Sequence, residues 1–219
     1  MSNSWLPTWL GVAASAAFVA VLAVHVWHLV RCTGRARAWH CVHVLMALGM
    51  IDMFLPTGRL IMPAGVGEAV FGFAAVTVAG FAVTVWARGG GWIWLIAGVD
   101  LAAMVYMFAM SSTRVGWLTW LLVAWFAVEA LGWATGRLGG VAASGLGGSR
   151  ALPAIETAAL ASVRIDAYAR TESVARLGST YALSIRVTLV VMSVGMAYML
   201  MAMQLGMHTE PGMPGMPRM

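Results

Sequence analysis

Residues 9–55 decide the fold class: they read WLGVAASAAFVAVLAVHVWHLV, then RCTGRARA, then WHCVHVLMALGMIDMFL. Two apolar runs, residues 9–30 and 39–55, flank a short turn that carries three arginines. A helix that crosses a bilayer needs about 20 mostly apolar residues. The first run has that length, whereas the second is shorter and contains two histidines and an aspartate. The stretch predicts a transmembrane helical hairpin with a basic turn.

The chain as a whole is strongly apolar. Of all 219 residues, 61% are hydrophobic and 10% are charged, and the mean hydropathy is +0.85. A soluble domain of this size could not bury so much apolar surface, and a bilayer does not require it to be buried. Four further runs cover residues 64–87, 92–111, 115–135 and 184–206. We therefore predict an all-α integral membrane protein, a six-helix transmembrane bundle with five of its helices within residues 1–135.

Arginines orient the predicted bundle. All 13 basic residues are arginines, and ten of them lie in the first, third and fifth connections or at their edges: Arg31, Arg35, Arg37, Arg88, Arg137, Arg150, Arg164, Arg170, Arg176 and Arg186. Arg59, Arg114 and Arg218 lie on the other side. The positive-inside rule places the first group in the cytoplasm and both termini outside. The net charge of +5 therefore reports membrane orientation, and no nucleic-acid partner is expected.

The fifth connection, residues 136–183, is the longest one. It begins with a Gly/Ser-rich linker at residues 139–149 and continues over residues 153–176, where helix formers alternate with charged residues. That mixture is typical of an amphipathic helix on an anionic membrane surface. We expect a cytoplasmic loop with a surface helix, followed by the sixth span at residues 184–206.

Methionines form three stripes. The chain has 17 methionines, and many recur at steps of three and four, which keeps them on one face of a helix. The stripes with their polar neighbours are His43, Met46, Met50 and Met53; Asp100, Met104, Met107 and Met110; and Met192, Met196, Met199, Met203 and Met207. Thioether sulfur is a soft, uncharged ligand suited to Cu(I) inside a membrane. The alternative is packing, because methionine fills helix interfaces well.

The tail, residues 207–219, extends the same chemistry outside the predicted membrane. After Met207 and His208 it reads TEPGMPGMPRM, in which methionine recurs at every third residue. A polyproline II helix has three residues per turn, so these sulfurs would line one face of an extended arm. The tail predicts copper capture, and biased composition without a role is the alternative.

The first hairpin carries four of the five histidines. His25 and His28 lie near the inner end of the first span, and His40 and His43 near the inner end of the second. Because a short turn makes the helices antiparallel neighbours, His28 should face His40 and His25 should face His43. Cys32 continues the face of the first pair. Neutral imidazole suits copper, zinc and iron, so the cluster predicts metal or proton handling. Hydrogen bonding to backbone or lipid headgroups is the alternative.

Three acidic residues lie in predicted spans. Asp100 begins the stripe of the fourth span, Asp52 lies near the outer end of the second, and Glu129 lies toward the inner end of the fifth. Each is expected to pair with an arginine or to carry a proton. Asp100 is the strongest candidate because it shares a face with methionines. No second carboxylate is expected near the histidines, which disfavours a di-iron centre.

Residues 25–53, the histidine hairpin with its first methionine stripe, resemble a family of uncharacterised, Met- and His-rich multi-pass membrane proteins of actinobacteria. The resemblance covers most of the membrane part, implies a bacterial cytoplasmic (inner) membrane, and carries no established activity. The Met-x-x-x-Met pairs are also similar to the selectivity motif of eukaryotic high-affinity copper importers. Those importers have three spans, so this likeness concerns chemistry and not fold.

The sequence therefore predicts a copper-handling membrane protein that binds or conducts Cu(I) through the methionine stripes to the inner histidines. Another transition metal is the alternative cofactor. Two other functions stay open: a membrane metalloenzyme with a four-histidine centre, and a non-catalytic assembly or accessory subunit that supplies copper to a respiratory oxidase. The expected partners are the lipid bilayer, the copper ion, and an oxidase or a copper chaperone.

Overall fold

The computed structural model describes residues 7–55, 61–86, 91–109, 115–139 and 166–206, and within them it contains helices and turns but no strand. The helices are α1 (Thr8–Arg31), α2 (Gly34–Phe54), α3 (Ala64–Trp86), α4 (Gly91–Ala109), α5 (Gly116–Ala134) and α8 (Asp166–Gly206). Met110, residues 140–165 with most of the linker and the first part of the predicted surface helix, and the tail with Met207 and His208 lie outside the described residues. The all-α prediction is confirmed for the described part of the chain.

The length and apolar composition of the helices identify this chain as a multi-pass membrane protein. Within the described residues, five stretches are long and apolar enough to cross a bilayer, namely α1, α3, α4, α5 and residues 182–205 of α8. The remaining helix, α2, is less apolar because arginines and histidines occupy its first half. α2 nevertheless has the predicted position, directly after α1 and packed along it.

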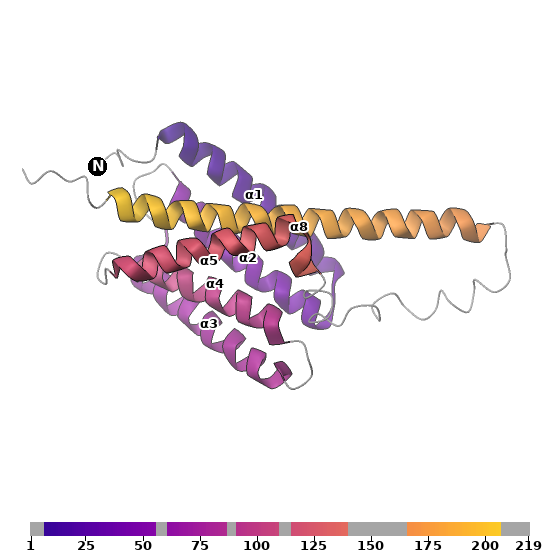
Figure 1. Cartoon of the computed structure of the whole chain (residues 1–219), viewed down its shortest axis with the longest axis horizontal. Coiled ribbons are helices and arrows are strands. Elements are labelled where there is room, and N and C mark those ends of the chain that lie inside the picture. Colours follow the sequence, from indigo (N-terminus) through magenta and orange to yellow (C-terminus); the bar gives the residue numbers. More distant parts are fainter. Residues whose placement is uncertain (1–6, 56–60, 87–90, 110–114, 140–165, 207–219) are drawn as a thin grey trace, which may run out of the picture.

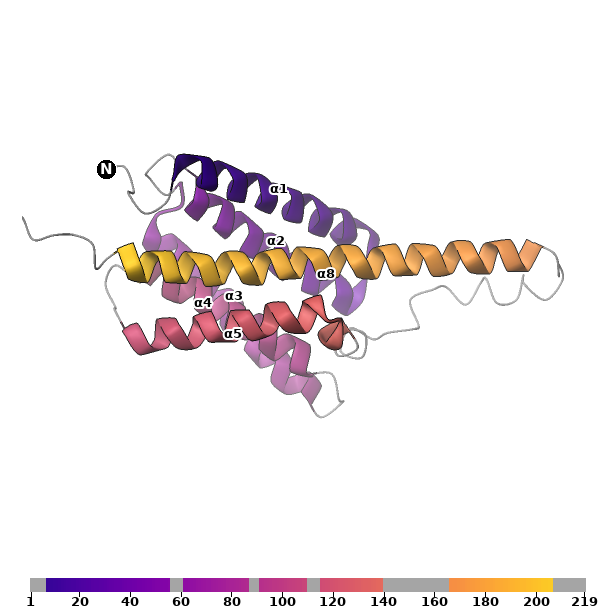
Figure 2. The same ribbon diagram turned by 45° about the horizontal axis from the view of Figure 1, so that its top comes forward.

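The helices pack as three sequential pairs, α1 with α2, α3 with α4, and α5 with α8 (Figure 1). α2 also contacts α4 and α8, and α8 lies alongside both α5 and α1 (Figure 2). Half of the apolar stretch of α4 and of α8 is buried, against 22% for α1 and α3 and 28% for α5. α2 buries nine of its 21 residues and contacts α1, α4 and α8, so the three helices that carry methionine stripes, α2, α4 and α8, are the inner ones.

α8 differs from its prediction. It runs without a break for 41 residues, or about 60 Å at 1.5 Å per residue, and its first part projects beyond the bundle (Figure 1). The predicted boundary between a surface helix ending at 176 and a span beginning at 184 therefore falls inside one helix. The segment between those points holds one glycine, Gly178, and no proline. A single glycine costs a helix only about 1 kcal/mol, which is too little to end it.

Turn chemistry explains two of the helix ends. α1 ends at Arg31, and the backbone N–H of Cys32 donates to the carbonyl of His28 at 2.8 Å. Gly34 follows with φ +61°, a backbone conformation that glycine adopts without a steric cost. After α5, Gly136 has φ +76° in the same way. These two turns reverse or redirect the chain at the end from which α8 projects.

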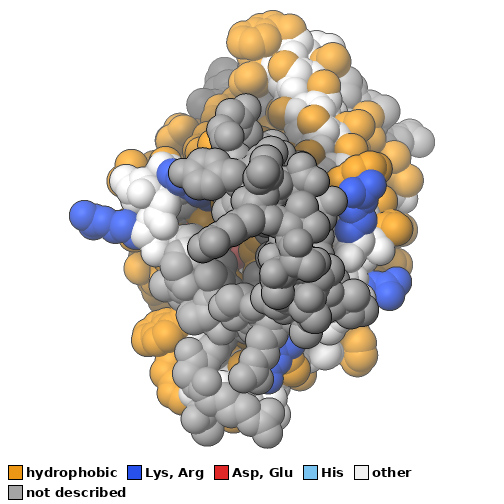
Figure 3. Space-filling model, turned by 90° about the vertical axis from the view of Figure 1, so that its right-hand side faces the viewer, with side chains coloured by type: hydrophobic (Ala, Val, Ile, Leu, Met, Phe, Trp, Pro, Cys, Tyr) orange, Lys and Arg blue, Asp and Glu red, His pale blue; other side chains and the backbone are white. Residues whose placement is uncertain are grey.

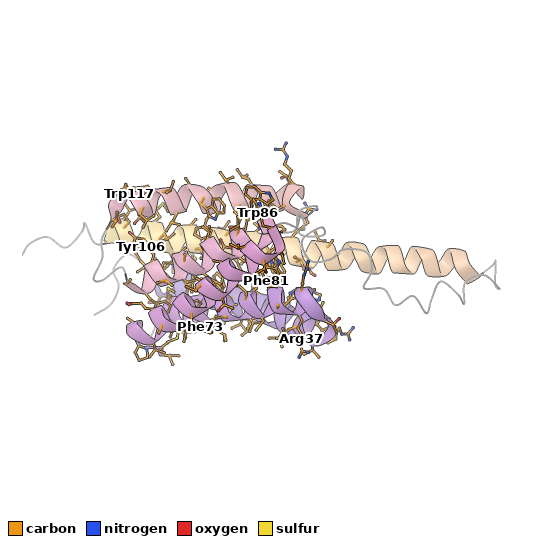
Figure 4. All side chains as sticks on the ribbon, turned by 90° about the horizontal axis from the view of Figure 1, so that it is seen from below. Arg37, Phe73, Phe81, Trp86, Tyr106 and Trp117 are labelled. Atoms are coloured by element: carbon orange, nitrogen blue, oxygen red, sulfur yellow. The ribbon has the colours of Figure 1, made fainter. Side chains whose placement is uncertain are left out.

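That end of the bundle is basic. The C-terminus of α1, the N-terminus of α2 and the C-terminus of α5 meet there, and they carry Arg31, Arg35, Arg37 and Arg137. Figure 3, which views this end, shows basic side chains near the edge of the face, with hydrophobic side chains among them. Figure 4 shows Arg37 at this end, with Tyr106 and Trp117 at the opposite one. Arg59, Arg114 and Arg218, which the sequence predicts on the other side, lie outside the described residues, so the orientation of the bundle stays a prediction.

Candidate functional site

The methionine stripes turn toward the centre of the bundle. Seven methionine side chains of the stripes are exposed by 3% or less, namely Met46, Met50, Met104, Met107, Met192, Met196 and Met199. Met53 and Met203, at the ends of their stripes, are partly buried against the same core. Met201, which lies off the stripe of α8, is half-buried. The 3.6-residue period therefore identified the inward face of each helix correctly.

Two glycines bring the inner helices close together. A Cβ atom added to Gly49 of α2 would lie 2.5 Å from the Cε of Met104 on α4. A Cβ atom added to Gly195 of α8 would lie 2.5 Å from Phe18 and 3.6 Å from the Cε of Met50. Small residues permit such close approach between helices in membranes. The three stripes consequently share one core.

The histidines pair across the α1–α2 hairpin as their spacing predicts. The ring centroids of His25 and His43 are 5.0 Å apart and those of His28 and His40 are 5.2 Å apart. His25 and His40 are also joined, with 3.0 Å between their Nδ1 atoms. The Nε2 atom of His28 is 3.4 Å from the hydroxyl of Ser184, which links the cluster to α8.

These histidines form a stack of parallel and tilted rings and do not converge on a point. In the described part of the chain, no group of three or more His, Cys, Asp or Glu side chains is placed to hold a metal ion. The two Nδ1 atoms of His25 and His40 are engaged with each other, and His25 stacks on His43 with 16° between the ring planes. A metal centre built from the four histidines alone is therefore not favoured. Cys32 is half-buried beyond this stack, and Cys41 is exposed.

Trp39 orients His43, the histidine beside the centre of the bundle. Trp39 is 1% exposed, and the centroid of its indole ring lies 4.0 Å from the centroid of the His43 ring. The Nδ1–H of His43 donates to the backbone carbonyl of Trp39 at 2.8 Å. This bond sets the tautomer of a neutral imidazole and leaves the lone pair on Nε2. A metal-binding histidine typically has its second nitrogen held in this way.

Beside His43 lies a cavity of about 10 Å³, which is close to the space that one water molecule requires. It lies between four helices and is lined by both soft and hard donor groups. The lining residues are His43 and Met46 of α2, Asp100 of α4, Phe126 and Glu129 of α5, and Leu189, Met192, Ser193 and Met196 of α8. The stripes of α2 and α8 and the top of the α4 stripe thus meet at one point.

Two carboxyl groups lie together at the cavity, and the sequence did not predict this pair. Asp100 and Glu129 are 5% and 6% exposed, and their side chains are hydrogen-bonded to each other. Glu129 also accepts a hydrogen bond from Nε1 of Trp133 at 3.0 Å and interacts with Ser193. Among the described residues, the groups that act on these two carboxyls are Trp125, Trp133, Ser193 and the carboxyls themselves, and no arginine is one of them.

The expectation that no second carboxylate lies near the histidines is wrong, because Asp100, Glu129 and His43 line the same cavity. One feature of the sequence could have indicated that Glu129 points into the bundle. Glu129 and Trp133 are four residues apart, so they lie on the same face of α5. A carboxyl group inside a membrane requires a partner, and a second buried acid in the neighbouring span was the available one.

Asp52 and Arg186 have structural contacts. The backbone N–H groups of Ile61 and Met62 donate to the Asp52 carboxylate at 2.6 and 3.3 Å, so this acid holds the connection into α3. Arg186 of α8 donates to the carbonyls of Trp133 and Ala134 at 3.1 and 2.6 Å and thereby caps the C-terminus of α5.

At the end of the bundle opposite the basic one, the hydroxyl groups of Tyr106 on α4 and Thr119 on α5 are hydrogen-bonded at 2.8 Å.

Comparison with known proteins places the chain in a family. The profile of a family described as a domain of unknown function (DUF5134) matches residues 35–203, and the chain belongs to that family. This agrees with the resemblance to uncharacterised membrane proteins. No curated protein and no solved structure shows a significant match to the chain.

Proposed function

We propose that this member of the DUF5134 family handles copper in a bacterial inner membrane, by passing Cu(I) between its methionine stripes and its histidine cluster. The proposed bundle has six spans, with α2 as the second, and both termini lie outside. Basic residues around the end from which α8 projects support a cytoplasmic location for that end. The polar residues of α2 are compatible with a span because His40 and His43 are 0% and 3% exposed and meet protein instead of lipid.

The observation that carries the proposal is the burial of seven thioethers on the three inner helices. Lipid tails and methionine are both apolar, so hydrophobicity alone gives no reason to place methionines at the centre and valines outside. Val76 and Val83 of α3 are 74% and 73% exposed, whereas the methionines named above are almost fully enclosed. A soft cation crossing a low-dielectric region requires neutral donors that replace its water, and thioethers supply them.

The histidine cluster is the proposed inner receiver. It lies on α1 and α2 between the central cavity and the basic end, so an ion leaving the stripes would meet imidazoles next. Imidazole rings arranged in this way offer nitrogen donors in sequence and no closed cage. That arrangement fits temporary ligation along a path better than a permanent catalytic metal.

A triple variant tests the proposal. Met50→Leu, Met107→Leu and Met199→Leu together remove one buried sulfur from each inner helix and preserve side-chain volume closely. We expect copper accumulation by expressing cells to fall to the level of cells without the protein, while Met201→Leu leaves it unchanged. Membrane abundance and thermal unfolding of both variants serve as controls. Copper accumulation at the wild-type level in a folded triple variant would show that the methionines only pack.

A further inference from the structure

Three thioethers face the central cavity from two helices. Met46 comes from α2, and Met192 and Met196 lie one turn apart on α8. All three are exposed by 3% or less, so a bound ion would be shielded from water on this side. Thioethers bind soft ions such as Cu(I) and contribute no charge. Within the described residues, no three His, Cys, Asp or Glu side chains are placed to hold a metal ion, so a metal site at this cavity would need the thioethers as ligands.

His43 adds a prepared nitrogen donor. Its Nδ1–H is committed to the carbonyl of Trp39 at 2.8 Å, which leaves Nε2 with a lone pair for a ligand. The ring is fixed between Trp39, with centroids 4.0 Å apart, and His25, with centroids 5.0 Å apart. A donor held in its binding orientation loses little entropy when an ion arrives.

The opposite wall supplies one negative charge. Asp100 and Glu129 are buried and line the same cavity, and two neighbouring carboxyl groups that hold one proton between them carry one negative charge. Oδ1 of Asp100 and Oε2 of Glu129 are buried and have no hydrogen-bond partner. An unpartnered buried carboxylate oxygen is costly in a membrane, and both of these belong to residues that line the cavity.

We propose that the cavity is a binding site for one monovalent soft cation, held by Met46, Met192, Met196 and His43 and neutralised by the Asp100–Glu129 pair. A cavity of about 10 Å³ accommodates one ion. One positive charge against one negative charge leaves the site neutral, as a low-dielectric environment favours. A divalent ion such as Zn²⁺ would be neutralised only if the pair also released its remaining proton, and Zn²⁺ prefers nitrogen, oxygen and thiolate ligands to thioethers. The site deepens the proposed function and depends on it, because a protein that binds no Cu(I) has neither.

Silver is the appropriate probe, because Ag⁺ is a soft monovalent ion that does not change oxidation state under assay conditions. The full chain, purified in detergent, is titrated with Ag⁺ in competition with a chelator, and with Zn²⁺ as the challenger. We expect one Ag⁺ per chain at this site and no displacement by a hundredfold excess of Zn²⁺. The double variant His43→Gln, Met46→Leu should weaken Ag⁺ binding by about 100-fold or more, since two ligands are lost.

Two carboxyl variants separate charge from shape. Asp100→Asn with Glu129→Gln keeps a hydrogen-bonded pair but removes the negative charge, and we expect at least about tenfold weaker Ag⁺ binding. Asp100→Glu with Glu129→Asp exchanges the two acids, keeps the charge, and should retain binding within a few fold. Thermal unfolding without metal, followed by tryptophan fluorescence, confirms that each variant is folded before titration.

The outcomes distinguish the site from the function. Wild-type Ag⁺ affinity in a folded His43→Gln, Met46→Leu variant would overturn this site, and the proposed function would survive if the Met50, Met107, Met199 triple variant still abolished copper accumulation. Wild-type Ag⁺ affinity in the folded Asp100→Asn, Glu129→Gln variant, or displacement of Ag⁺ by Zn²⁺, would overturn the charge assignment. A wild-type protein that binds neither Ag⁺ nor Cu(I) would overturn both proposals.

Discussion

Gly49 offers the sharpest test of the packing between the methionine stripes. A methyl group added at this position would lie 2.5 Å from the Cε of Met104 and 2.6 Å from the Cζ of Phe71. Both distances are far below the 3.5–4.0 Å at which carbon atoms pack favourably. The end of Met104 can bend away, but the Phe71 ring is 0% exposed and stacked on Phe108 with centroids 5.5 Å apart. The Gly49→Ala variant therefore has to displace an aromatic pair.

The expected loss of stability in Gly49→Ala is best measured against a matched control variant in α3. Gly80 has no heavy atom within 4 Å of an added Cβ, so Gly80→Ala adds a methyl group without a clash. Both substitutions gain the same helix propensity, about 1 kcal/mol, so that gain cancels between them. Overpacking a tight core costs about 1–3 kcal/mol. We expect Gly49→Ala to be less stable than Gly80→Ala by about that amount.

The assay is reversible unfolding of the purified variants in mixed micelles with increasing denaturing detergent, followed by circular dichroism. The free energies of unfolding of the two alanine variants are compared with each other and with the wild-type protein. Gly80→Ala should match or exceed the wild type. If Gly49→Ala were as stable as Gly80→Ala, the close approach of α2 to α4 would be refuted, and with it the shared core of the two stripes.

Two further predictions concern contacts outside the cavity. Asp52→Ala removes the acceptor of two backbone N–H groups and should lower the free energy of unfolding by about 1–3 kcal/mol in the same assay, whereas Asp52→Asn keeps one oxygen and should lose less. Arg186→Met removes the cap from α5 and should cost about 1–2 kcal/mol, since the guanidinium is only half-buried. Arg186→Lys should recover part of that loss, and wild-type stability of Arg186→Met would show that the cap contributes nothing.

The elements that the sequence predicted well are those that local patterns define. The first span was expected at residues 9–30 and α1 covers Thr8–Arg31; the third was expected at 64–87 and α3 covers Ala64–Trp86. α2 begins five residues before its predicted start at Trp39, because helix continues through Arg35 and Arg37. The stripes were placed on the correct faces because helical period and burial both act within a few residues.

The sequence by itself determined an all-helical membrane protein, the inward faces of its methionine helices and the pairing of histidines across a short turn. Each of these depends on length, period or a single tight connection. Only the tertiary structure decided that Glu129 of α5 meets Asp100 of α4 beside His43 of α2. That meeting depends on how each helix is rotated and at what depth it packs, which contacts between distant segments set. For the same reason, only the structure showed α8 continuing past the bundle as one helix and the three sulfurs gathering at one cavity.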